Sequence, residues 1–231
     1  MKLHQFVVGM LALAFCASAP EAEAAKAAAS LSKVTVCGVG GPSCLAGTQV
    51  QNGVWQDVMS SSIKTANITD LFIDVSMVTG LYTSTTVKGN NTGTESSAVA
   101  MGGVKVRVLL DGQPALTFPD RGDGITFDQR VQTLTAKLGN IFTDCFAQGG
   151  NTGTGCTLDP QELSLALDTT SAHSFNYILL NVGPGMHTVT VQAMVNTRAS
   201  GNDGGTAVAN AIYGMGTMTV DAVALTNSFL F

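Results

Sequence analysis

Alternation of apolar and polar residues with a period of two is the feature that most restricts how this chain of 231 residues can fold. In residues 104–110, valine and leucine occupy every second position, and a lysine and an arginine lie between them. Residues 71–78, 163–168 and 189–196 alternate in the same way. Successive side chains of a β-strand point to opposite faces, so each segment predicts a strand with one buried and one solvated face.

Short clusters of Gly, Asn and Asp separate these segments. They lie at residues 90–93, 111–112, 123–124, 183–185 and 202–205. Such residues adopt the backbone angles of tight turns at little cost. Many strands between Gly-marked turns predict an all-β fold, namely an antiparallel β-sandwich of jelly-roll type that forms a single domain over residues 33–231.

Two stretches depart from this pattern. Asp159 as a helix N-cap, Pro160 at the first helical position and Glu162 closing a capping box predict a single helical turn. Residues 131–145 combine helical spacing of apolar residues with threonines and a glycine. We expect a strand there that runs into an irregular excursion.

The segment 183–191 reads Gly-Pro-Gly-Met-His-Thr-Val-Thr-Val. It resembles the glycine turn and β-branched strand found in many secreted bacterial β-sandwich modules of jelly-roll or immunoglobulin-like type. The resemblance implies the same fold class as the alternation and carries no implication for activity.

The N-terminus has the layout of a secretory signal peptide. Lys2 precedes an apolar run at residues 6–15, and small residues follow up to an Ala-Glu-Ala cleavage pattern at residues 22–24. The pattern predicts a signal peptide over residues 1–24 and a flexible leader over residues 25–32. We therefore expect the protein to be secreted, to the extracellular space or the periplasm.

Four cysteines follow the predicted cleavage position: Cys37, Cys44, Cys145 and Cys156. Four cysteines allow three pairings. The local pairs Cys37–Cys44 and Cys145–Cys156 are favoured because each brackets a glycine-rich stretch. Their spacing does not match a zinc site, and an exported chain meets oxidising conditions, so structural disulfides are expected.

The charge pattern argues against several classes of function. The formal net charge is −5 at pH 7, only 12% of residues are charged, and basic residues do not cluster. Such a chain is a poor candidate for binding nucleic acid, and we expect no membrane span. Only His173 and His187 follow the signal peptide, and no nucleophile motif such as Gly-x-Ser-x-Gly accompanies them. We expect no catalytic residues.

Two groups of residues are candidates for binding sites. Asp120, Asp123 and Asp128 surround a glycine-containing loop, and clustered carboxylates can hold Ca²⁺; the alternative is a tight hairpin. Trp55 could be an exposed platform on which a sugar ring stacks; the alternative is an anchor in the core.

These observations favour a secreted, non-enzymatic structural or adhesive protein that contacts further copies of itself or a cell-surface polysaccharide. A carbohydrate-binding module, with Trp55 in the site and Ca²⁺ as a stabilising ion, is the alternative. A secreted hydrolase that uses carboxylates or a histidine is a third reading.

Overall fold

The computed structural model describes residues 26–36, 52–89, 94–115, 117, 122–143 and 157–225. The predicted signal peptide and Asp120 lie outside these residues. So do all the cysteines of the two expected disulfides: Cys37, Cys44, Cys145 and Cys156.

The described chain is all-β and contains two antiparallel sheets, which confirms the predicted fold class at this level. The first sheet has the order β1 (Lys26–Val36), β11 (Thr206–Val223), β3 (Thr69–Lys88) and β9 (Glu162–Val182). The second sheet has the order β2 (Gln56–Thr65), β10 (Gly185–Asn202) and β4 (Ser96–Leu110).

Beyond β4, the short β5 (Gln113–Pro114) and the long β6 (Ile125–Ala136) share one edge. A separate ribbon joins β7 (Asn140–Thr143) to β8 (Thr157–Pro160).

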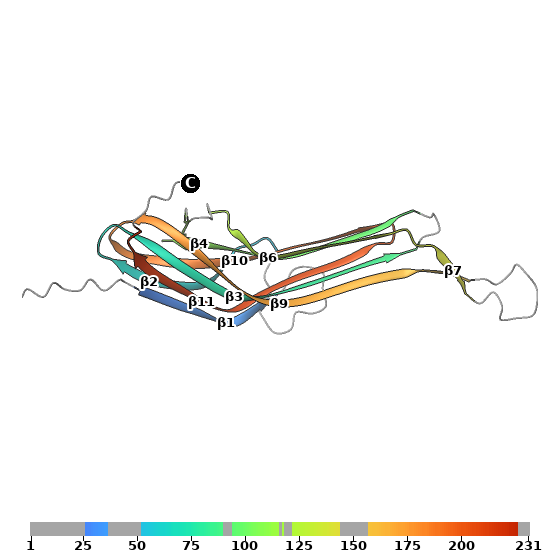
Figure 1. Cartoon of the computed structure of the whole chain (residues 1–231), viewed down its shortest axis with the longest axis horizontal. Coiled ribbons are helices and arrows are strands. Elements are labelled where there is room, and N and C mark those ends of the chain that lie inside the picture. Colours follow the sequence, from blue (N-terminus) through green and yellow to red (C-terminus); the bar gives the residue numbers. More distant parts are fainter. Residues whose placement is uncertain are drawn as a thin grey trace, which may run out of the picture.

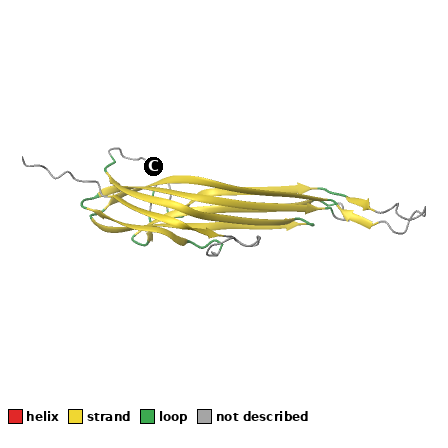
Figure 2. Cartoon of the chain, turned by 90° about the horizontal axis from the view of Figure 1, so that it is seen from below, coloured by secondary structure: helices red, strands yellow, loops and turns green. Residues whose placement is uncertain are grey.

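The molecule is elongated because the strands run along its long axis (Figures 1 and 2). The ribbon of β7 and β8 lies at one end, here called the ribbon end. The turns that follow β2, β4 and β9 lie at the opposite end, here called the turn end, since Thr65 pairs with Gly185 and Leu110 with Val189.

The core lies between the two sheets and follows the alternation seen in the sequence. Val104, Val106 and Val108 are fully buried, as expected for the inner face of β4. The large buried side chains Tyr177 and Tyr213 belong to the same cluster. Toward the ribbon end, most of the buried residues other than Val87 are small or polar: Thr83, Thr85, Ala98, Ala100, Ala209 and Ala211. The core is therefore aliphatic and aromatic near the turn end and thin near the ribbon end.

Three polar side chains of β6 close one side of the body, between β6 of the second sheet and β9 of the first. They are Asp128, Arg130 and Gln132, here called the polar seam. Asp128 accepts a 2.6 Å hydrogen bond from the Thr79 hydroxyl, and Arg130 donates from Nη1 to the carbonyl oxygens of Leu81 and Leu167. A strand of the second sheet thus binds two strands of the first through its side chains.

Gln132 is the most buried member of the polar seam. Its Oε1 accepts a 2.8 Å hydrogen bond from the Thr83 hydroxyl. Its Nε2 donates to the Thr85 hydroxyl at 2.6 Å and to the Leu165 carbonyl oxygen at 2.7 Å. Because a buried polar group is costly without a partner, this amide and its three partners depend on one another.

Two expectations from the sequence differ from the structure. Residues 26–31, expected to be part of a flexible leader, form the first half of β1 and pair with β11. Residues 159–162, expected to form a helical turn, contribute the end of β8 and the start of β9 instead. At residues 159–162 strand pairing outweighs the local signal, since capping residues contribute only about 1 kcal/mol.

Candidate functional site

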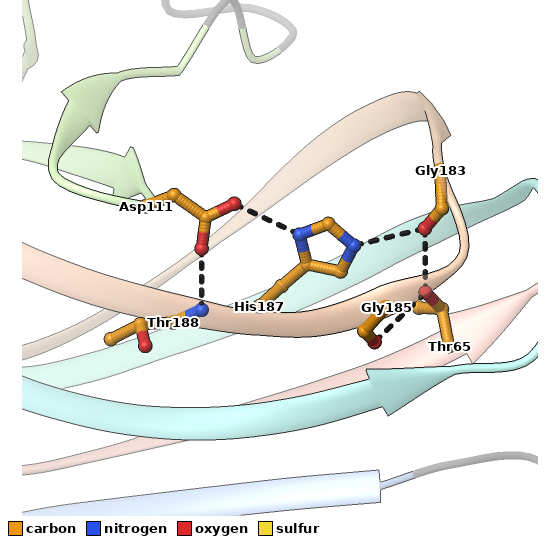
Figure 3. Close-up of polar contacts among 6 residues, drawn as sticks. All are labelled: Thr65, Asp111, Gly183, Gly185, His187 and Thr188. Atoms are coloured by element: carbon orange, nitrogen blue, oxygen red, sulfur yellow. Dashed lines mark hydrogen bonds and ion pairs between the residues drawn. The ribbon is translucent and has the colours of Figure 1, made fainter.

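A cluster of polar groups joins three turns at the turn end (Figure 3). Asp111 follows β4, Gly183 follows β9, and His187 lies near the start of β10. Asp111 accepts from the Thr188 backbone N–H at 2.8 Å through Oδ1, and its Oδ2 lies 2.9 Å from His187 Nδ1. The other ring nitrogen, Nε2, lies 2.9 Å from the Gly183 carbonyl oxygen. The Thr65 hydroxyl donates to the same carbonyl at 2.6 Å. Together these residues are here called the turn cluster.

Local sequence explains why Asp111 can occupy this position. Its φ angle is +53°, in the left-handed region that Asp and Asn tolerate better than most residues. The turn chemistry of Asp111-Gly112 was readable in the sequence, but its contact with His187 depends on the pairing of β4 with β10.

The geometry favours a positively charged imidazole. Both ring nitrogens of His187 face oxygen acceptors, so the protonated ring can donate to each. The hydrogen bond to Asp111 raises the pKa of His187 above its usual value, although partial burial opposes this. The hydrogen bond from His187, followed by that from the Thr188 N–H, lowers the pKa of Asp111. Through its two ring nitrogens, His187 connects the turn after β4 to the turn after β9.

The turn cluster predicts a pH dependence of stability. The raised pKa of His187 stabilises the fold below about pH 6.5, and this contribution is lost as the pH rises through the folded-state pKa. The lowered pKa of Asp111 stabilises the fold above about pH 4, and this contribution is lost as the pH falls through the folded-state pKa. We expect Asp111→Asn to lower the free energy of unfolding by less than about 1 kcal/mol, since the half-exposed carboxylate is screened by solvent.

Urea unfolding at pH 5.5 and pH 9 measures this effect, with the larger loss expected at about pH 5.5. Asp168→Asn is the matched control because Asp168 is exposed on β9, away from the turn cluster. If Asp111→Asn lowered the free energy of unfolding equally at both pH values, the charged contact between Asp111 and His187 would not contribute to stability.

Of the three residues expected to bind calcium, the structure describes Asp123 and Asp128. Asp123 is exposed in the turn before β6, whereas Asp128 belongs to the polar seam, where its Oδ2 also lies 3.5 Å from His173 Nε2. Asp120 lies outside the described residues. Within the described ranges, no three His, Cys, Asp or Glu residues group so as to hold a metal ion.

Trp55, the candidate sugar platform, lies just before β2 and is half-buried. The guanidinium carbon of Arg107 lies 4.4 Å from the centroid of its ring. The ring also lies against Gly124, where a Cβ atom would come within 2.4 Å of Cη2. A sugar therefore cannot stack on the face that Arg107 covers.

Three exposed leucines on β9 were not recognisable as a surface feature from the sequence. Leu163, Leu165 and Leu167, here called the leucine row, are 46%, 41% and 41% exposed. They pair with the buried Val87, Thr85 and Thr83 and share their side of the sheet. The alternation correctly predicts the strand, but the second sheet does not cover this part of its inner face.

Comparison of the chain with protein-family models, curated proteins and solved structures finds no match. In the part of the chain that the structure describes, no helix is long and apolar enough to cross a membrane.

Proposed function

We propose that this chain is a secreted, non-enzymatic structural or adhesive protein, built as a disulfide-linked β-sandwich of jelly-roll type, that associates with further copies of itself. The leucine row is the observation that carries the proposal. Secretion and the disulfides rest on the N-terminal pattern and on the cysteine spacing.

The order of the strands supports a jelly-roll-like sandwich. The strands β1, β2, β3 and β4 lie alternately in the first and second sheets, and so do β9, β10 and β11. Alternation between two packed sheets is the arrangement that jelly rolls share.

The leucine row supports self-association. Nine consecutive residues of β9, from Glu162, are exposed, and among the described strands β9 pairs with β3 alone. Three leucines at every second position match themselves in a second copy that runs antiparallel, with Leu165 opposite Leu165. Burying the apolar surface of these leucines between two copies would stabilise the contact by roughly 25 cal/mol per Å².

The edge of β9 favours contact through side chains rather than through added strand pairing. Gln132 and Arg130 of the polar seam donate to the carbonyl oxygens of Leu165 and Leu167. Occupied edge carbonyls discourage another strand from pairing there. The leucine side chains, in contrast, stay available to a partner.

The turn cluster supports a role without catalysis. Its histidine has both nitrogens in hydrogen-bonding contact with protein oxygens, which leaves neither to take a proton from a substrate.

Light scattering coupled to size exclusion, with negative-stain microscopy, tests the proposal on the processed protein. We expect dimers or larger assemblies whose mass increases with concentration. Leu165→Lys should shift the protein to the monomer mass, because it places a charge in the centre of the leucine row.

Val131→Lys is the matched control, since Val131 is 60% exposed on β6 and lies outside the leucine row. It should leave assembly unchanged. A protein that stays monomeric at millimolar concentration, or one that assembles equally well with Leu165→Lys, would overturn the proposal.

A further inference from the structure

Arg107 is held in a fixed position on the outer face of the second sheet. Its Nε donates a 2.7 Å hydrogen bond to Gln192 Oε1, and its guanidinium carbon lies 4.4 Å from the centroid of the Trp55 ring. The hydrogen bond and the aromatic face together restrict a side chain that otherwise samples many rotamers.

The residues that hold Arg107 are themselves fixed. Gln192 Nε2 donates to Asp57 Oδ1 at 2.6 Å, and this contact orients the amide so that Oε1 faces Arg107. The Trp55 ring lies against Gly124, which has a φ angle of +78° and no side chain to displace the ring. The chain of contacts from Asp57 to Gly124 crosses the sheet from β2 to the start of β6.

Within the described part of the chain, the terminal nitrogens of Arg107 have no partner and are available to a ligand. Among the described residues, Nη1 and Nη2 form no hydrogen bond and no carboxylate pairs with this guanidinium. Lys105 lies two residues earlier on the same face, about 7 Å away along the strand. The outer face thus presents a planar fork of donors with a second cation beside it, on a chain whose net charge is negative.

We propose that Arg107, oriented by Gln192 and Trp55 and assisted by Lys105, binds the anionic group of an acidic polysaccharide, either a uronate carboxylate or a sulfate ester. The guanidinium fork matches two oxygens of such a group. The site lies on an open sheet face, which suits an extended polymer, and the indole edge offers an apolar surface to the adjoining sugar ring.

This site is independent of the leucine row, which lies on the inner face of the first sheet. Only the choice of a polysaccharide as the source of the anion rests on the proposed secretion. Binding should therefore persist in the Leu165→Lys variant, which separates failure of this inference from failure of self-association.

Isothermal titration of the processed protein with four polymers tests the site. Polygalacturonate and dextran sulfate carry the two anionic groups, and methyl-esterified polygalacturonate and dextran are their neutral counterparts. We expect binding to at least one charged polymer, weakened by salt, and none to the neutral ones. Binding to polygalacturonate alone would identify a uronate carboxylate as the group that Arg107 binds. Binding to dextran sulfate alone would identify a sulfate ester.

Variants identify the residues. Arg107→Gln should weaken binding about tenfold or more, and Gln192→Glu should do the same by placing a carboxylate against the guanidinium. Lys64→Gln, which removes an equal charge at the far end of β2, should bind like the unaltered protein. Circular dichroism checks that each variant is folded.

Three results would overturn the inference: no binding to either charged polymer, equal binding to the neutral polymers, or equal weakening by Arg107→Gln and Lys64→Gln.

Discussion

Gln132→Leu is expected to lower the free energy of unfolding by about 3 kcal/mol. The substitution keeps the approximate shape of a buried side chain but removes the amide that serves Thr83, Thr85 and the Leu165 carbonyl. Each buried group left without a partner costs about 1–3 kcal/mol, and partial access of water at the β9 edge keeps the sum near the lower bound. The melting temperature should fall by roughly 6–12 °C, measurable by circular dichroism or calorimetry.

Gln129→Leu is the matched control on the same strand. Gln129 lies on the exposed outer face of β6, and its amide contacts only the Met101 sulfur among the described residues. A surface change of this kind should alter stability by no more than about 0.5 kcal/mol. Equal losses for the two variants would show that the polar seam does not hold the two sheets together.

Gly205→Ala is expected to destabilise the protein by about 3 kcal/mol, at the upper end of typical overpacking costs. A Cβ atom at this position would lie 2.0 Å from the Ser97 carbonyl oxygen and 2.9 Å from that of Asn202. Both obstacles are backbone atoms, so the turn between β10 and β11 must move away from the start of β4. Urea unfolding measures the loss, and proteolysis near the turn should become faster.

Gly139→Ala is the comparison for this prediction. No atom lies within 4 Å of a Cβ built at Gly139, and its φ angle is not in the left-handed region. Alanine there should be neutral or slightly stabilising, because it restricts the unfolded chain. If both alanine variants unfolded at the same urea concentration, close backbone approach at Gly205 would not limit stability.

The strands themselves were largely readable from the sequence. Val104, Val106 and Val108 alternate with charged residues, and all three are buried on the inner face of β4. Residues 71–78 and 189–196 likewise fall within β3 and β10. Alternation works here because one face of each strand packs against the other sheet, so the physical requirement is visible in a single segment.

The polar seam was not readable, and the reason is the register. Asp128, Arg130 and Gln132 look like the solvated face of a strand, and their partners lie on β3 and β9, far away in the sequence. Which strands lie opposite β6 depends on the whole sheet order, which no local pattern encodes.

In the candidate sites, too, residue type and alternation were visible in the sequence, whereas the contacts between residues were not. Trp55 was recognised as a candidate by residue type, and Arg107 was placed on the solvated face by alternation. Their stacking follows from the path of the chain before β2 and from the position of Gly124. The leucine row shows the opposite case: its alternation predicts burial, and only the extent of the second sheet leaves it exposed.

The pairing of the first described strand with the last has a consequence for how the chain reaches its native state. Lys26 of β1 lies opposite Asp221 of β11, so the first sheet cannot close until nearly the whole polypeptide is available. Such sequence-distant contacts slow folding. Under the proposed secretion, β1 would therefore meet its partner strand only after β11 has also crossed the membrane.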